Sequence, residues 1–242
     1  MNNRSKYILG FTTLITLVVC ATVRSVAPVY GSGTDSRPQQ IVRSGSACDA
    51  GVFVKALPEL GEKNIALVRK YAEVYGVDFR LILALMKQES QFREDAVSER
   101  GAVGLMQMMP VTHLQVSNEL EIAGNEMEVS NLEAGVYYFS KLATLFSDAE
   151  PENRMRLALA AYNAGPSRVY DAQEIAAYLG EDPHEWSSVE NSLPLLSMRY
   201  YSLHHAVWTS GRPNAGYYGS WRQTTSYVER VMKTYKKYCS IS

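Results

Sequence analysis

The chain has 242 residues and a mass of 27.0 kDa, and 46% of its residues are hydrophobic while 20% are charged. This composition is typical of a globular protein with a buried core, and it excludes a wholly disordered, collagen-like or coiled-coil chain. The 24 basic and 25 acidic side chains nearly cancel, so the net charge gives no reason to expect binding to nucleic acid. The three cysteines and four histidines are not clustered, and the sequence indicates neither a metal site nor a bound cofactor.

The first 31 residues have the layout of an export signal. Arg4 and Lys6 precede an uncharged run at residues 7–23, and small residues at which a peptidase could cut follow this run. Two alternatives remain open, because the run is just long enough for an uncleaved membrane anchor and Cys20 allows a lipoprotein signal. All three interpretations predict an exported protein.

Residues 32–50 lack an apolar period and are predicted to be a linker, followed by one domain at residues 51–242. Removal of the signal leaves two cysteines, Cys48 and Cys239, which flank almost the whole of this domain. Because exported proteins fold in an oxidising compartment, we predict a disulfide between them. The alternative is a pair of unrelated thiols.

Apolar residues recur at helical spacing along the predicted domain, and no stretch alternates apolar and polar residues as a half-buried strand does. One helix is expected to follow Asp78, a residue type that caps helix N-termini. We therefore predict one mainly α domain. The other predicted helices cover residues 64–75, 132–146, 154–164, 193–209 and 223–238.

Glu89 breaks the pattern of its own helix. It follows Leu85 by four residues and Met86 by three, so it shares their apolar stripe. Burial of an unpaired carboxylate is costly and raises its pKa, which is the property that a general acid needs near neutral pH. The alternative is that Glu89 ends the helix, pairs with Lys87 or Arg93, and has no function.

Two short segments after Glu89 could contribute to a binding site. Gly101 and Gly104 lie three residues apart, and such glycines allow the backbone to turn tightly and to approach a ligand closely. Met106 and Gln107 then supply apolar surface and one amide. Residues 161–165, with the sequence AYNAG, place a tyrosine hydroxyl beside an amide at the predicted end of a helix.

Together these segments resemble a known family, the lytic transglycosylases with an SLT-type domain. The resemblance implies a mainly α, lysozyme-like fold with a deep glycan-binding groove. It also implies a periplasmic enzyme that cleaves peptidoglycan strands between N-acetylmuramic acid and N-acetylglucosamine. The resembling segments are ESQF at 89–92, GAVGLMQMMP at 101–110, NLEAGVYY at 131–138, AYNAGP at 161–166 and a late YV at 227–228.

The resemblance also implies roles for individual residues. Glu89 would be the single catalytic residue, acting first as acid and then as base, while the acetamido group of the substrate stabilises C1 and its C6 hydroxyl closes a 1,6-anhydro ring. Tyr162 is expected to hydrogen-bond Glu89, and Tyr227 is expected to close the same cleft. The residues implied to line the groove are Ser90, Met106, Gln107, Tyr162, Asn163 and Tyr227.

The chain departs from the family pattern at two places. Gln223 stands where the family often has Glu, which removes a charge that could contact a cationic group of the stem peptide. Residues 171–218 exceed the simplest members in length and could extend the groove, dock a partner, or form an extra helix pair with a capping loop.

Other functions fit the same residues. A lysozyme-type hydrolase would use water in place of the C6 hydroxyl, and a non-catalytic envelope component would only hold glycan strands. A compatible refinement is an enzyme that opens the cell wall for an envelope-spanning secretion or pilus apparatus, because the predicted domain is small and carries no wall-anchoring repeats.

Overall fold

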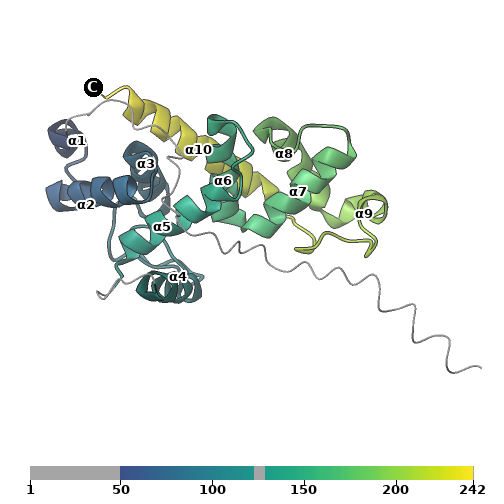
Figure 1. The fold of residues 1–242 in the computed structure, drawn as a ribbon, viewed down its shortest axis with the longest axis horizontal. Helices are drawn as coiled ribbons and strands as arrows, with labels where there is room; N and C mark the ends of the chain where they lie inside the picture. The colour runs from purple at the N-terminus through teal and green to yellow at the C-terminus, as the bar shows by residue number, and fades with distance from the viewer. Residues whose placement is uncertain (1–49, 123–128, 242) are drawn as a thin grey trace, which may run out of the picture. The chain divides into compact units, whose positions relative to one another are not determined.

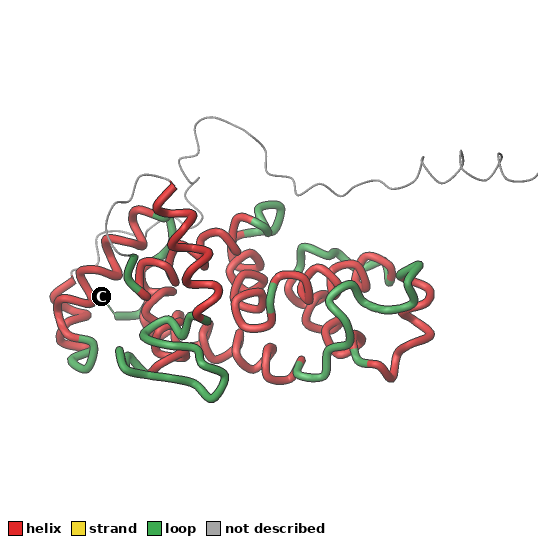
Figure 2. Tube along the Cα trace, turned by 90° about the horizontal axis from the view of Figure 1, so that it is seen from below, coloured by secondary structure: helices red, strands yellow, loops and turns green. Residues whose placement is uncertain are grey.

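The computed structural model describes residues 50–122 and 129–241. All of them belong to one compact unit, Pro38–Ser242, and the other unit, Met1–Arg37, lies outside the described residues. The regular elements in the described part of the chain are helices, and only isolated β-bridges occur beside them (Figure 2). The predicted mainly α fold is confirmed.

Helices of seven to nineteen residues and two short 3₁₀ segments follow one another along the chain (Figure 1). They are α1 (Ala50–Ala56), α2 (Gly61–Val74), α3 (Phe79–Ser90), α4 (Pro110–Ile122), α5 (Asn131–Thr144), α6 (Pro151–Ala164), α7 (Pro166–Tyr178), α8 (Trp186–Ser192), η1 (Leu193–Leu196), η2 (Met198–Tyr200), α9 (Tyr201–Val207) and α10 (Trp221–Cys239).

The predicted signal or anchor at 1–31, with its uncharged run, lies outside the described residues, as does nearly all of the predicted linker. These features stay predictions. None of the helices in the two described ranges has the length and apolar character needed to cross a membrane.

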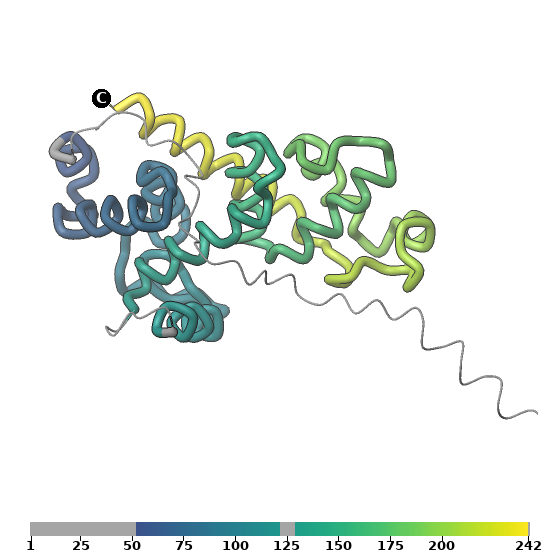
Figure 3. Tube along the Cα trace, viewed as in Figure 1, coloured from purple at the N-terminus to yellow at the C-terminus, as the bar shows by residue number. Residues whose placement is uncertain are grey.

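Two helices form the centre of the core. Residues 81–86 of α3 and residues 157–161 of α6 are completely or almost completely buried. Helix α10 packs against both of them, and Figure 3 shows it, in yellow, running from beside α3 past α6. Glu89, the predicted catalytic residue, lies on α3. It is therefore covered by α10, which is the last helix in the sequence.

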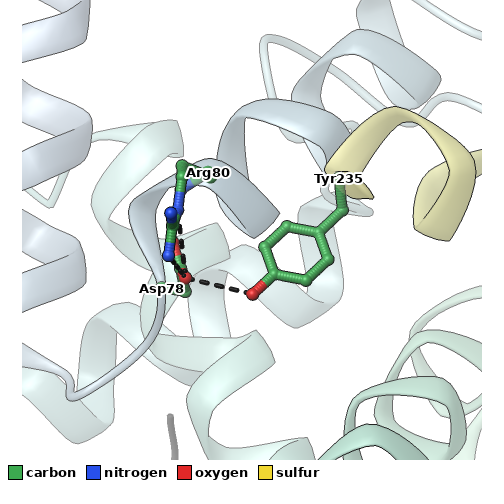
Figure 4. Close-up of polar contacts among 3 residues, drawn as sticks. All are labelled: Asp78, Arg80 and Tyr235. Atoms are coloured by element: carbon green, nitrogen blue, oxygen red, sulfur yellow. Dashed lines mark hydrogen bonds and ion pairs between the residues drawn. The ribbon is translucent and has the colours of Figure 1, made fainter. Parts of the chain in front are cut away.

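The N-terminus of α3 is fixed by a polar cluster (Figure 4). Asp78 caps the helix, because one of its carboxylate oxygens accepts a hydrogen bond from the backbone N–H of Arg80 at 2.9 Å. The Arg80 guanidinium also binds this carboxylate, and the hydroxyl of Tyr235 on α10 donates to it at 3.1 Å. At the other end of α3, Tyr227 of α10 donates to Glu89. The two helices are therefore antiparallel, and both ends of the contact are hydrogen-bonded.

The single helix predicted at residues 193–209 is wrong, because the segment divides into η1, η2 and α9. If η1 continued as an α-helix, the carbonyls of Leu195 and Leu196 would accept hydrogen bonds from the backbone N–H groups four residues later in the chain. Instead, the Leu195 carbonyl contacts the ring nitrogen of His204 at 2.7 Å, and the Leu196 carbonyl accepts from the backbone N–H of Tyr218 at 3.0 Å. Tertiary partners thus replace the helical ones.

Residues 171–218 form most of α7, the short elements α8 to α9, and the loop that follows. The helix α7 begins at Pro166, directly after α6 ends, because proline is well suited to the first turn of a helix. The segment therefore holds more helices than the predicted pair, and its role in extending the groove or docking a partner stays a prediction.

Candidate active site

Glu89 lies in the last turn of α3 and is half-buried beside the fully buried Leu85 and Met86. Burial raises the pKa of its carboxyl to about 7, and a hydrogen bond from Tyr227 opposes part of that increase. A carboxyl that titrates near neutral pH can donate a proton and later accept one under physiological conditions.

The alternative in which Glu89 is a structural ion pair is wrong. The Lys87 ammonium lies 3.4 Å from a carboxylate oxygen of Glu59, and the Arg93 guanidinium donates to the backbone carbonyl of Ser90 at 3.2 Å. Neither cation pairs with Glu89. Desolvation of its carboxyl is therefore not offset by a positive charge from these neighbours.

The tyrosine that contacts Glu89 is Tyr227, and the predicted bond from Tyr162 is wrong. The Tyr162 hydroxyl donates instead to the backbone carbonyl of Met106 at 2.7 Å. Its ring is held by Tyr138 and Phe139 of α5, with ring centroids at 5.7 and 6.3 Å. The pKa of Tyr162 is raised well above its ordinary value, mainly by burial and then by the Glu89 charge. Tyr162 is thus near Glu89 without being bonded to it.

Residues 101–108, which we call the site loop, are fastened to three helices by polar side chains. The Ser90 hydroxyl of α3 donates to the Leu105 carbonyl at 2.9 Å, and Tyr162 of α6 donates to the Met106 carbonyl. The side chain of Asn131, on α5, accepts from the Met106 backbone N–H at 3.0 Å. These bonds fix the site loop beside the end of α3.

The roles implied for Ser90 and Met106 need correction. Both side chains are buried, with exposed fractions of 1% and 0%, so they do not line an open groove. Ser90 is turned inward because its hydroxyl also bonds the Met86 carbonyl one helical turn back, at 3.2 Å. They position the site loop and contact no open surface.

Two glycines let the site loop approach α5 closely. A Cβ atom on Gly104 would lie 2.6 Å from the Asn131 side-chain oxygen, and its φ of +75° is one that other residues rarely adopt. A Cβ atom on Gly135 would lie 2.5 Å from the Met106 side chain. Asn131 and Gly135 are four residues apart on one helix face. In the sequence, the signal for this close approach is Gly135, which lies inside the helix predicted at residues 132–146.

Backbone strain is concentrated around the site. Within the described ranges, positive φ angles of residues other than glycine occur at Gln91, Phe92 and Gln107, at 54°, 67° and 46°. The Gln107 side-chain amide donates to the carbonyls of Ala96 and Gly104 at 2.9 and 3.0 Å, which holds its own strained backbone. Such strain clusters at functional sites, because the surrounding structure must maintain it.

Asn163 lies half-buried at the end of α6 and is linked to α10. Its side-chain oxygen accepts from the Thr224 hydroxyl at 2.8 Å, and that hydroxyl also bonds the Tyr218 hydroxyl at 2.6 Å. The Arg168 guanidinium lies 5.0 Å from the centre of the Tyr218 ring. Gln223, beside Thr224, is exposed to solvent.

A hollow of about 270 Å³ lies on the α2 and α5 side of the site loop. Asn64 closes one side of it by donating to the Glu94 carboxylate at 2.6 Å. The residues that line the hollow are Lys63, Asn64, Leu67, Glu94, Gly104, Leu105, Ser130, Asn131 and Leu132.

Glu89 is not among these lining residues, and the predicted deep groove over Glu89 stays a prediction.

No group of three potential metal ligands occurs in the described part of the chain. Cys239 is exposed at the last residue of α10, and Cys48 lies outside the described residues. The disulfide therefore stays a prediction.

A family model described as the transglycosylase SLT domain matches residues 66–183. This range contains Glu89, the site loop, Asn131 and Tyr162, but not Tyr227. Residues 66–183 therefore form a transglycosylase SLT domain.

Two relatives of the SLT-domain protein are named membrane-bound lytic murein transglycosylase F and membrane-bound lytic murein transglycosylase F 1. The protein from Desulfosudis oleivorans is 38% identical over 170 residues, covering 70% of this chain and 35% of the relative. A second, from Alkalilimnicola ehrlichii, is 35% identical over 168 residues, covering 68% and 31%. The chain spans about a third of the length of these relatives.

Two solved structures are also similar to the SLT-domain protein. An inactive variant of the lytic transglycosylase Slt from Pseudomonas aeruginosa is 26% identical, with a TM-score of 0.48, and the match covers 72% of this chain and 23% of that one. The 70 kDa soluble lytic transglycosylase from Escherichia coli is 22% identical, with a TM-score of 0.47 and the same coverage.

Proposed function

We propose that this protein is a peptidoglycan lytic transglycosylase. It would cleave the β-1,4 bond between N-acetylmuramic acid and N-acetylglucosamine without water and leave 1,6-anhydro ends. The observation that carries the proposal is Glu89, a desolvated carboxyl with a pKa of about 7. Among the described residues no second carboxylate contributes to that pKa. The names of the relatives support the same substrate and reaction.

A single carboxyl is sufficient if the substrate supplies its own nucleophile. In the first step, protonated Glu89 gives its proton to the glycosidic oxygen as the bond to C1 breaks, and the acetamido carbonyl oxygen bonds to C1. In the second step, the Glu89 carboxylate takes the proton of the C6 hydroxyl, and O6 bonds to C1 while the acetamido oxygen leaves. Most glycosidases need a second carboxylate for this work.

Tyr227 would keep the Glu89 carboxyl oriented during both steps. Its hydroxyl donates to one carboxylate oxygen, which leaves the other oxygen to carry the transferred proton. Burial, followed by the Glu89 charge, raises the pKa of Tyr227 well above its ordinary value, so its hydroxyl stays protonated as a donor. The site loop, fixed by Ser90, Asn131 and Tyr162, would hold the substrate beside it.

The test is a digest of purified peptidoglycan analysed by mass spectrometry. The wild-type protein should release fragments with 1,6-anhydro ends, and Glu89→Gln should fold and release none. Glu73→Gln, which changes an exposed carboxylate on α2, is the matched control and should retain full activity. Reducing ends would indicate a lysozyme-type hydrolase. Glycan binding without any cleavage by the wild type would indicate a non-catalytic envelope component.

The proposed substrate implies an envelope location, and we propose the periplasm. Export by residues 1–31, with or without retention of residues 7–23 as an anchor, would deliver the enzyme there. Service to a secretion or pilus apparatus remains the prediction made from the sequence. Fractionation of cells that express the full chain would test the location.

A further inference from the structure

A second cavity lies away from the candidate active site, between α7 and the loop after α9, which we call the capping loop (residues 208–220). Its volume is about 400 Å³, within the range of small-ligand sites. Helices α7 and α9 lie apart from α3 in Figure 1, and the hydrogen bonds of the lining side chains within the described residues run to neither Glu89 nor the site loop. The lining residues are Ser167, Tyr170, Asp171, Gln173, Glu174 and Asn214.

The walls of this cavity are held by hydrogen bonds within the protein. Asp171 is buried, and its two carboxylate oxygens accept from the backbone N–H groups of Asn214 and Ala215 at 3.0 and 2.8 Å. The Glu174 carboxylate accepts from the indole N–H of Trp208. The capping loop is therefore fixed to α7.

Several polar groups in the cavity remain available. Within the described ranges, no side chain or backbone group is hydrogen-bonded to the hydroxyls of Ser167 and Tyr170. Gln173 uses its amide nitrogen on the Pro183 carbonyl at 2.8 Å, which leaves its side-chain oxygen as an acceptor. Among the described residues, hydrogen-bond donors reach only one oxygen of Glu174. The cavity thus offers both donors and acceptors to a ligand that carries hydroxyl and amide groups.

The charge of the lining selects against anions. Two carboxylates line the cavity, and no lysine, arginine or histidine does. Phosphates, nucleotides and the carboxylates of stem peptides would therefore be repelled. Cationic ligands and neutral ligands rich in hydroxyl groups remain compatible with this lining.

Aromatic side chains support a sugar ligand. The strongly exposed aromatic residues in the described part of the chain are all tyrosines of α7, α9 and the capping loop. Tyr170, which lines the cavity, is 38% exposed, and its ring centroid lies 5.7 Å from that of Phe146. A supported, exposed tyrosine offers both a flat apolar surface and a hydroxyl to a sugar ring. The others are Tyr178, Tyr201 and Tyr217.

We propose that this cavity is an accessory glycan-binding site, which takes a neutral N-acetylhexosamine unit of a peptidoglycan strand. The choice of this glycan rests on the proposed function, whereas binding at the cavity requires no cleavage. An accessory site would retain the enzyme on the glycan between cuts by raising the local concentration of strands at Glu89.

The test is a titration of the full chain carrying Glu89→Gln with tri-N-acetylchitotriose, followed by nuclear magnetic resonance. The indole N–H resonance of Trp208 reports the cavity, because this group bonds Glu174 in its lining. We expect this resonance to shift on titration. Tyr170→Ala should weaken the binding measured at Trp208 about tenfold or more, equivalent to about 1.4 kcal/mol.

The matched control is Tyr178→Ala, which removes another exposed tyrosine of α7 that does not line the cavity. It should leave the affinity unchanged. Ser167→Ala removes a hydroxyl without a partner in the described protein and should weaken binding severalfold, so the test remains decisive if Tyr170→Ala does not fold. A Trp208 resonance that does not respond to millimolar sugar, or equal losses in Tyr178→Ala and the cavity variants, would overturn the proposal. Failure of the wild type to cleave peptidoglycan would overturn only the proposed enzymatic function.

Discussion

Replacement of Glu89 by Gln is expected to stabilise the protein at alkaline pH and to have little effect at acidic pH. Burial raises the pKa of this carboxyl from its ordinary value of 4.5 to about 7. Between these values the folded protein keeps the proton and the unfolded chain releases it. Because the unfolded chain then binds fewer protons, the free energy of unfolding of the wild type falls as the pH rises through this window.

The magnitude follows from the gap between the two pKa values. At about 1.4 kcal/mol for each tenfold change in the proton equilibrium, the wild type loses up to about 3 kcal/mol between pH 4.5 and 7. Gln has nearly the same shape, can still accept the hydrogen bond from Tyr227, and does not ionise. Relative to wild type, Glu89→Gln should therefore gain up to about 3 kcal/mol of stability over this range.

Urea denaturation followed by circular dichroism, at several pH values from about 4 to about 8.5, measures this difference. Glu73→Gln is again the matched control, because an exposed carboxylate loses little hydration on folding and should show no such gain. If the difference between Glu89→Gln and wild type were constant across this range, Glu89 would not be a desolvated carboxyl. The physical argument for its role as general acid would then fail.

Three further outcomes are expected. Tyr227→Phe removes the hydrogen bond that lowers the pKa of Glu89. In a profile of kcat/KM against pH, the pH at which cleavage is lost should therefore move upward. A move to lower pH would contradict the assignment. Asn131→Ala removes bonds that hold the site loop and should cost about 1–3 kcal/mol in urea denaturation; a cost near zero would mean that other contacts hold the loop. Thiol labelling of the unfolded, unreduced mature chain should find Cys48 and Cys239 paired, and reduction should remove up to roughly 5 kcal/mol. Two reactive thiols would rule out this disulfide.

The sequence by itself determined the helical character of the domain and the position of its catalytic candidate. The 3.6-residue period placed Glu89 among apolar neighbours, and desolvation of its carboxyl follows from that period. The glycines of the site loop likewise predicted a close backbone approach, which Gly104 makes to Asn131. These features are local, because helix periodicity and glycine conformation depend on residues only a few positions apart.

Only the tertiary structure decided which side chains meet. Tyr162 and Tyr227 were both candidates for the cleft, and 138 positions separate Glu89 from Tyr227, the residue that bonds it. Periodicity indicates which face of a helix is apolar, but not which residue of a distant helix lies opposite a given carboxylate. That partner depends on the register of α10 against α3. The hydrogen bonds at both ends of α3 hold this register. For the same reason, the inward orientation of Ser90 could not be predicted, because its acceptor on Leu105 is brought near by the folded site loop.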